Sequence, residues 1–202
     1  ESGLFTARAL QAGEAELSAW DNSSDNRFSA EKAGIEPVDF TKKDLREFTT
    51  LVVSSQAWDT DRYARIITED ALDNNLEVIC DVELLARTQR EASFVGITGD
   101  YGKSLTGALV TYIMQVTGRE AEMVGFSGSS ALNTEPLGME GAYIIEMTPF
   151  RLNHTVSITY DVATLLNLCS EEQVDNTMQI FHRQTSPRAA VISVDDKPSH
   201  II

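Results

Sequence analysis

Residues 94–107, FVGITGDYGKSLTG, decide the fold of this chain. The apolar run 94–98 is typical of a buried strand, residues 99–104 of a glycine-bearing loop, and residues 105–118 of a helix that ends at Gly118. A strand, a Gly-x-x-Gly-Lys-Ser loop and a helix, in this order, form a phosphate-binding loop, because backbone N–H groups and the helix N-terminus hold phosphate oxygens. The stretch therefore predicts an α/β fold with a nucleotide site at a strand end.

This loop supplies the residue types that phosphate chemistry needs. Gly99 and Gly102 leave room for phosphate groups beside the backbone. Lys103 can reach the terminal phosphates, and the hydroxyl of Ser104 can hold magnesium. The usual consensus has one more glycine, at the position of Ile97. The alternative is a glycine-rich turn in which the Lys-Ser pair is accidental, but the flanking strand and helix favour the phosphate loop.

Two polar residues end strands further along the chain. Glu146 ends the apolar run 142–147, where a carboxylate can complete a magnesium site beside Ser104. Asn167 ends the run 162–168 and precedes an acidic group. Taken singly, Glu146 is better explained as a solvated strand-end glutamate, and the acidic group after Asn167 as a solvated loop. The carboxyl ends of parallel strands are where open α/β sheets bind ligands, and this favours a role in the site for both.

The rest of the chain repeats the rhythm of strand and helix that predicts a parallel sheet. We expect further helices over 3–12 and 67–75, further strands over 15–21, 51–55, 76–80, 122–126 and 189–194, and a polar loop over 22–29. The polar stretch 88–92 marks a boundary between a Rossmann-like domain, residues 1–91, and a phosphate-loop domain, residues 92–202. The first domain opens on a loop and helix, so its first strand is expected to precede residue 1.

Composition narrows the function classes. The chain has 202 residues, with 31 Asp plus Glu against 16 Lys plus Arg and a net charge of −15, a poor balance for binding nucleic acid. No apolar run approaches the roughly 20 residues of a membrane span, and the N-terminus does not resemble a signal peptide. Cys80 and Cys169 match no zinc or redox spacing. We therefore expect a cytoplasmic protein.

Several motifs, taken in order, resemble those of the Mur ligases of peptidoglycan synthesis. Residues 98–104 are similar to the family's Thr-Gly-Thr-Asn-Gly-Lys-Ser, and residues 146–152 are similar to its Glu-x-Ser-Ser-Phe-Gln-Leu. Residues 167–175 resemble its Asn-hydrophobic-x-x-Asp-His-x-Asp. Residues 194–196 resemble its Val-Asp-Asp, and residues 81–84 resemble its Asp-Ile-Glu-Leu. Near the N-terminus, Ser2, Gly3 and Leu4 resemble the first loop that contacts the UDP group, and Asp21 resembles the family's strand-end aspartate.

The resemblance implies an ATP-dependent amide ligase that uses Mg²⁺. ATP would phosphorylate the carboxylate of a UDP-muramoyl-alanine precursor, and the amino group of D-glutamate would displace the phosphate. By the same resemblance Lys103 and Glu146 are catalytic, Ser104 and Glu146 hold the metal, and the nucleotide is bound by Gly99, Gly102, Lys103, Ser104 and Asn167. Ser2, Gly3, Leu4 and Asp21 would bind the precursor; the alternative for Asp21 is a cap on the loop that follows it.

The sequence departs from the family's motifs at positions that would contact phosphate, metal or substrate. Asp100 puts a carboxylate in a loop that should attract phosphate, and Tyr101 replaces the asparagine beside it. Gln173 stands at the position of a metal-binding histidine, and Phe126 replaces an asparagine of a substrate loop. No lysine occurs between Lys103 and Lys197, so the family's carbamylated lysine has no counterpart.

We also expect no counterpart of the family's third, C-terminal domain, which closes over ATP, and hence no ligation by this chain alone. The alternative function is a catalytically degenerate relative that serves as a binding or regulatory protein. A different phosphate-loop hydrolase is disfavoured, because the run 142–147 carries no aspartate.

Overall fold

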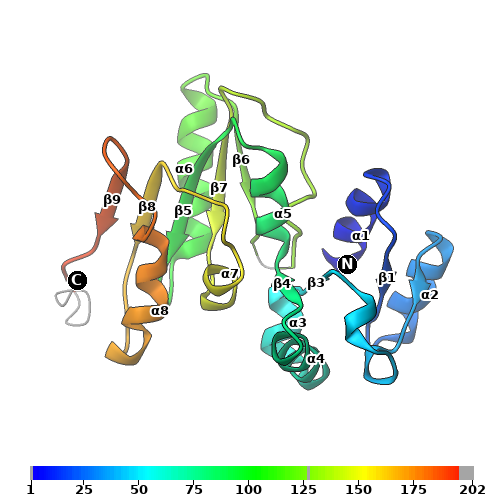
Figure 1. Cartoon of the computed structure of the whole chain (residues 1–202). Helices are drawn as coiled ribbons and strands as arrows, with labels where there is room; N and C mark the ends of the chain where they lie inside the picture. Colours follow the sequence, from blue (N-terminus) through cyan, green and yellow to red (C-terminus); the bar gives the residue numbers. More distant parts are fainter. Residues whose placement is uncertain (1, 127, 196–202) are drawn as a thin grey trace.

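The computed structural model describes residues 2–126 and 128–195, apart from the side chain of Ser2. It contains one five-stranded sheet and two two-stranded sheets, and all their strands pair in parallel (Figure 1). The large sheet has the order β6-β7-β5-β8-β9, with bounds Ala121–Val124, Ala142–Glu146, Ser93–Thr98, Val162–Leu165 and Ala189–Ile192. The predicted parallel α/β fold is therefore confirmed, with each of these five strands within a few residues of its expected place.

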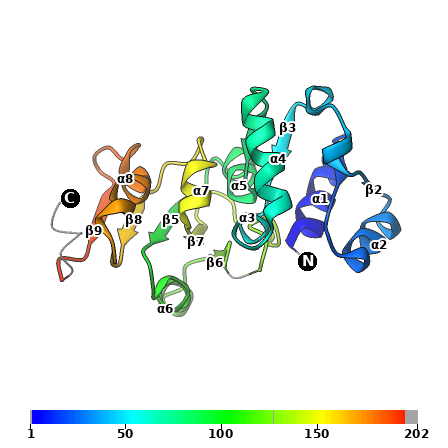
Figure 2. The same cartoon turned by 90° about the horizontal axis from the view of Figure 1, so that it is seen from below.

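The sheet is covered on both faces. Helix α6 (Lys103–Val116) lies on one face, and α5 (Asp81–Thr88) and α7 (Pro149–Asn153) lie on the other (Figure 2). Strand β7 is buried on both sides, and Tyr143, Ile144 and Ile145 are inaccessible to solvent. An apolar strand without alternation is what a parallel sheet between two helical layers requires.

Helix α6 begins two residues earlier than expected. Gly102 precedes it with φ +85°, a left-handed conformation that a glycine adopts without steric cost, and the helix starts at once with Lys103. It ends at Val116, before Gly118. The strand, loop and helix of the phosphate-loop pattern are thus present in the predicted order.

The N-terminal part is built from smaller elements. Helix α1 (Ser2–Ala12) and helix α2 (Ser24–Lys32) accompany the pair β1 (Ser18–Ala19) and β2 (Glu36–Pro37). The pair β3 (Thr50–Val52) and β4 (Glu77–Ile79) is joined by α3 (Ser55–Thr60) and α4 (Arg62–Asp73). The expected Rossmann-like strands do pair in parallel, but in two separate sheets, because strands of two or three residues offer few ladder hydrogen bonds.

The expectation of a loop over 22–29 is wrong. Helix α2 begins inside that stretch, after Ser23, with Asp25 in its first turn near the positive end of the helix dipole. The helix has no strong apolar stripe, and only Ala30 is buried, in a small cluster with Ala7 and Ile35. The polar composition of residues 22–29 predicts a loop, but the structure has a helix there that packs on the N-terminal part through Ala30.

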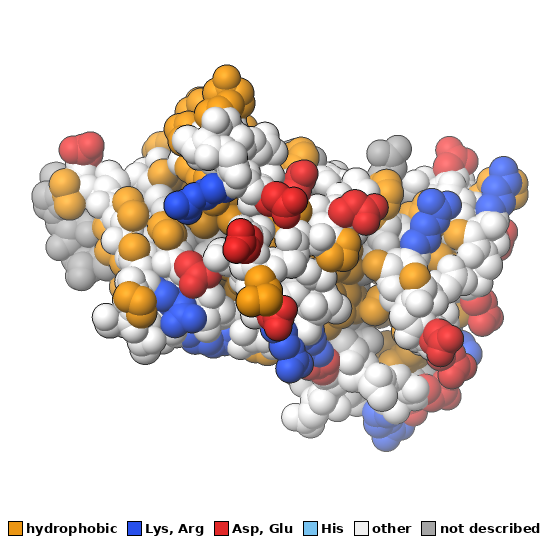
Figure 3. Space-filling model, turned by 90° about the horizontal axis from the view of Figure 1, so that it is seen from above, with side chains coloured by type: hydrophobic (Ala, Val, Ile, Leu, Met, Phe, Trp, Pro, Cys, Tyr) orange, Lys and Arg blue, Asp and Glu red, His pale blue; other side chains and the backbone are white. Residues whose placement is uncertain are grey.

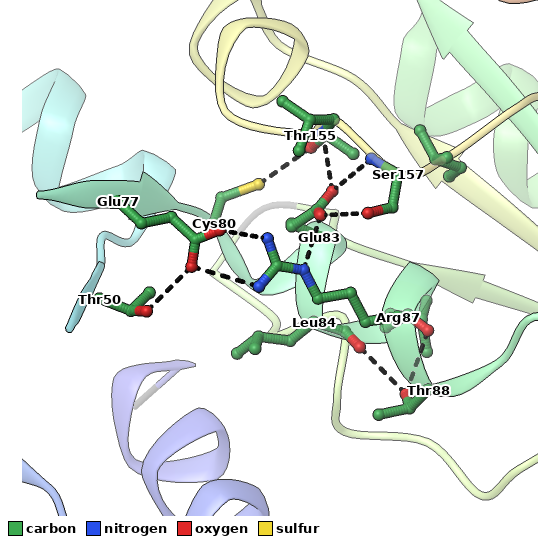
Figure 4. A network of polar contacts seen from close by, with 12 residues as sticks. Thr50, Glu77, Cys80, Glu83, Leu84, Arg87, Thr88, Thr155 and Ser157 are labelled. Atoms are coloured by element: carbon green, nitrogen blue, oxygen red, sulfur yellow. Dashed lines mark hydrogen bonds and ion pairs between the residues drawn. The ribbon is translucent and has the colours of Figure 1, made fainter.

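A polar network attaches the β3–β4 pair to the main core. The carboxylate of Glu83 on α5 is inaccessible to solvent and accepts hydrogen bonds from the amides of Val156 and Ser157, from the Ser157 hydroxyl and from Arg87 (Figure 4). Arg87 also pairs with Glu77 of β4 at 2.6 Å. Burial raises the pKa of Glu83, but these hydrogen bonds lower it more, so the pKa lies below its usual value.

The outer face of α6 is apolar and uncovered among the described residues. Large hydrophobic side chains stand out from the molecule there (Figure 3). They are Leu105, Leu109, Tyr112, Ile113 and Val116, each more than half exposed. In the part of the chain that the structure describes, no helix is long and apolar enough to cross a membrane.

Candidate functional site

The phosphate loop lies against the end of β8. Oδ1 of Asn167 accepts hydrogen bonds from the amides of Asp100 and Tyr101, both at 3.0 Å, and its Nδ2 donates to the carbonyl of Tyr101 at 3.0 Å. Gly99, with φ +138°, packs so closely on Asn167 that a Cβ there would lie 3.1 Å from the Asn167 carbonyl oxygen. Two amides of the loop therefore already have a partner, supplied by a neighbouring strand.

The charged side chains of the loop also bind within the protein. Nζ of Lys103 donates to the carbonyls of Gly99, at 2.6 Å, and Asp100, at 3.2 Å. The carboxylate of Asp100 accepts from the amide of Cys169. The amide nitrogen of Gln173 lies 2.8 Å from the same carboxylate when it is oriented as a donor. Asp100 thus faces the segment after β8.

Ser104 and Glu146 meet at the carboxyl edge of the sheet. Oγ of Ser104 donates to Oε2 of Glu146 at 2.7 Å, so the two residues predicted to share a metal are brought together across 42 positions. Both offer the hard oxygen ligands that Mg²⁺ prefers, and Mg²⁺ is usually held by one or two carboxylates plus phosphate oxygens and water. The described residues hold no group of three or more His, Cys, Asp or Glu that could bind a metal. These residues fit a magnesium ion that arrives with a nucleotide.

The expected precursor site has a different local structure. Gly3 and Leu4 lie in the first turn of α1, which starts at Ser2, and so are helical here. The carboxylate of Asp21 accepts from the amide of Ser23 at 2.8 Å and from Nδ2 of Asn26 at 3.0 Å. Asp21 therefore caps the turn that leads into α2, as its alternative interpretation requires, while it remains exposed.

Sequence reasoning did not find the charged pair at the centre of the molecule. Asp81 begins α5 and Arg151 lies in α7; their side chains are 8% and 6% exposed, and Oδ1 of Asp81 lies 3.5 Å from Nη2 of Arg151. Arg151 stands between the apolar residues Phe150 and Leu152, but this local pattern does not indicate that its partner is Asp81. Of the motif residues near the chain end, Asp196 lies outside the described residues, and Asp195 is exposed.

Curated proteins similar to this chain share one description. The UDP-N-acetylmuramoylalanine–D-glutamate ligase of Rhodospirillum rubrum is 30% identical over 213 residues, which cover 98% of this chain and 45% of that protein. The ligase of the same name from Phenylobacterium zucineum is 33% identical over 210 residues, 96% of this chain and 45% of that protein. The chain is a relative of the Mur ligases. It spans a little under half the length of these curated proteins.

Solved Mur ligase structures have the same fold. The UDP-N-acetylmuramate:L-alanyl-gamma-D-glutamyl-meso-diaminopimelate ligase from Neisseria meningitides matches with a TM-score of 0.61 at 18% identity, over 98% of this chain and 69% of that chain. A murein peptide ligase from Psychrobacter arcticus matches with a TM-score of 0.57 at 16% identity, over 99% of this chain and 48% of that chain. No family model matches the sequence. The Mur ligase resemblance of the motifs is thus confirmed by full-chain sequence similarity and by fold.

Proposed function

We propose that this Mur ligase relative binds the UDP-muramoyl-alanine precursor and MgATP, as the corresponding part of a D-glutamate-adding ligase of peptidoglycan synthesis. In this proposal residues 1–91 form the precursor-binding domain and residues 92–202 the nucleotide-binding domain, and the protein acts in the cytoplasm. The first support is the sequence similarity to D-glutamate ligases over nearly the whole chain.

The observation that carries the nucleotide part is the meeting of Ser104 and Glu146. Their 2.7 Å contact lies at the start of α6, next to Lys103, at the strand edge where parallel sheets bind ligands. A bound Mg²⁺ would neutralise charge on the phosphate groups. Lys103 would then exchange its contacts with Gly99 and Asp100 for phosphate oxygens, and the amides at the start of α6 would donate to the same group.

A second candidate is a binding or regulatory protein without turnover. It is favoured by the loop itself, because the Asp100 and Tyr101 amides are held by Asn167 and a carboxylate stands among the groups that should attract phosphate. Nucleotide must compete with these contacts. We expect this chain by itself to bind the precursor, to bind MgATP weakly and to make no amide bond.

Two assays on the 202-residue chain separate these functions. The first measures thermal stabilisation by UDP-N-acetylmuramoyl-L-alanine, which a binding protein must show. The second measures phosphate release from ATP with precursor and D-glutamate, which we expect to be absent. Phosphate release that depends on D-glutamate would contradict the binding-only candidate and establish an active ligase; the absence of any shift with the precursor would contradict the proposed function.

Asp21→Ala tests the precursor site. If the carboxylate contacts the precursor, the variant shows a smaller ligand-induced shift in Tm than the wild type. The variant also loses the two hydrogen bonds that the carboxylate accepts from Ser23 and Asn26 in the turn before α2, so its Tm without ligand is measured as well. Asn26→Ala is the control, because it removes a hydrogen-bond partner of that carboxylate and leaves the carboxylate in place. Equal ligand-induced shifts in Tm for the wild type and Asp21→Ala would exclude this site.

A further inference from the structure

One buried ion pair holds the first part of the connection between β6 and β7 at both ends. This segment, residues 125, 126 and 128–131, is named the β6 loop here. At its start, the Gly125 carbonyl accepts a hydrogen bond from Nη1 of Arg151. At its end, the Ala131 amide donates to Oδ2 of Asp81 at 2.7 Å. The two side chains then meet each other at 3.5 Å, which closes a bridge across the loop.

The same guanidinium reaches the candidate metal site. Nη1 of Arg151 also donates to the backbone carbonyl of Glu146 at 3.1 Å, directly behind the carboxylate that contacts Ser104. Gly125 has φ +71°, and a Cβ there would lie 3.1 Å from Nη1 of Arg151, so glycine admits the guanidinium at this point. Arg151 therefore fixes the start of the β6 loop and the end of β7 together.

The β6 loop lies between the two proposed ligand sites. The hydroxyl of Ser130 is hydrogen-bonded to that of Thr6 on α1 at 2.9 Å, one turn after the residues expected to contact the UDP group. The other end of the loop is tied to Glu146 through Arg151. The β6 loop therefore links α1, which carries the residues expected to contact the UDP group, with the end of β7 that carries Glu146.

Stability alone does not account for the pair. Oδ1 of Asp81 and Nε of Arg151 are buried without a hydrogen-bond partner, and buried ion pairs often contribute less than apolar residues of similar size. The distance of 3.5 Å is also long for a charge-assisted hydrogen bond. Oδ2 of Asp81 and Nη1 of Arg151 nevertheless bind backbone groups of the β6 loop and β7.

We propose that Asp81 and Arg151 are positioning residues, which set the conformation of the β6 loop and of the Glu146 backbone and thereby the affinity for the UDP-muramoyl precursor. The affinity part rests on the proposed function. Neither side chain touches ligand, because both are buried beneath the groups that they hold.

Three variants and one control test this role. Arg151→Gln and Asp81→Asn each remove one charge, and the double variant removes both. Glu83→Gln is the control. Glu83 is a buried carboxylate on the same helix as Asp81, and it binds backbone amides and an arginine, but its partners are Val156, Ser157 and Arg87 and none of them belongs to the described part of the β6 loop. Hydrogen exchange of the Ala131 amide reports on the loop without ligand, calorimetry reports on precursor affinity, and Tm reports on the fold.

The expected results distinguish a positioning role from an effect on the stability of the fold. Arg151→Gln and Asp81→Asn raise the exchange rate of Ala131 relative to β5 amides and weaken precursor binding about tenfold. The double variant has a higher Tm than either single variant, because no unpaired buried charge remains, yet its exchange rate and affinity do not recover. Glu83→Gln lowers Tm while the Ala131 exchange rate and the affinity stay at wild-type values.

The proposal is overturned if the double variant recovers the wild-type exchange rate of Ala131 and the wild-type precursor affinity as its Tm rises. It is also overturned if Glu83→Gln changes that exchange rate and that affinity as much as the Asp81 and Arg151 variants do. If a single variant does not fold, the double variant decides by the same comparison with the wild type. A wild-type chain that binds no precursor contradicts the proposed function, whereas unchanged exchange of Ala131 in the variants contradicts the positioning role.

Discussion

Asp100 is the single residue most directly opposed to nucleotide binding. Its carboxylate lies in the loop that we propose to hold phosphate, and like charges within a few ångströms repel even at protein surfaces. Asp100→Thr, which introduces the residue of the family motif, should tighten MgATP binding by about 1 kcal/mol, roughly fivefold. Calorimetric titration of both proteins measures this.

Asp100→Asn separates charge from contact in that experiment. It keeps a side-chain oxygen that can accept from the amide of Cys169 but removes the negative charge. We expect it to behave like Asp100→Thr. Tight MgATP binding by the wild type, unchanged in both variants, would show that the carboxylate does not oppose phosphate.

Glu83 makes the stability of the folded chain depend on pH. Its pKa in the folded chain lies below the ordinary value of 4.5, so its contribution to stability is complete above that value and is lost as the pH falls through the lowered pKa. Glu83→Gln should cost about 2 to 4 kcal/mol at pH 7, because a buried network loses its charge-assisted hydrogen bonds.

Urea unfolding at several pH values checks this assignment. The gap in unfolding free energy between wild type and Glu83→Gln should be constant near neutral pH and should narrow as the solution is acidified below about pH 4. A gap that widens on acidification would mean that Glu83 is not ionised in the folded chain.

At the scale of elements, two glycines show how tightly the layers pack on the large sheet. A Cβ at Gly96 of β5 would lie 2.6 Å from the buried ring of Tyr160. A Cβ at Gly107 of α6 would lie 2.8 Å from the terminal methyl of Met123, which a flexible side chain can withdraw. Gly96→Ala should therefore cost about 1 to 3 kcal/mol.

Gly107→Ala is the matched control. It should be close to neutral, because the higher helix propensity of alanine, worth up to about 1 kcal/mol, offsets the shift of Met123. Equilibrium denaturation of both variants tests the comparison, and a larger loss for Gly107→Ala than for Gly96→Ala would contradict it.

The sequence predicted elements well where local pattern and tertiary structure agree. The run 94–107 combines an apolar strand, glycines and a helix, and β5 and α6 lie where these signals placed them. The contact of Ser104 with Glu146 followed from the parallel sheet, since strand ends share an edge. The sequence did not predict helix α2, because its polar residues form almost no apolar stripe at helical spacing.

The Asp81–Arg151 pair could not be predicted for a different reason. Its two residues belong to separate helices, and no local periodicity relates them. Their meeting depends on how α5 and α7 pack on one face of the sheet. The contacts of the Asp21 carboxylate with Ser23 and Asn26 likewise depend on how the chain turns into α2, and a role of Asp21 in precursor binding stays a prediction.

At the scale of the whole molecule, the apolar face of α6 contrasts with a net charge of −15. Repulsion between like-charged chains opposes association, whereas a contiguous exposed apolar surface favours it. Added salt screens the first effect and leaves the second, so light scattering of the wild type should rise with ionic strength.

Leu109→Lys should suppress that rise, because it interrupts the apolar face with a charge. Leu72→Lys is the control: Leu72 is 51% exposed and Leu109 is 52% exposed, but Leu72 lies on α4, away from that face. Equal scattering of the two variants would mean that the α6 face does not drive association.

The order of strands in the large sheet has a consequence for how the chain folds. Strand β5 lies at the centre, and both of its neighbours, β7 and β8, follow much later in the sequence. Contacts of high sequence separation close large loops of chain before they gain hydrogen bonds, which makes folding slow. During synthesis β5 emerges from the ribosome before either partner, stays unpaired until β7 has been made, and gains its second neighbour only when β8 follows. The nascent chain therefore passes through a period in which its future core is the segment most in need of a chaperone.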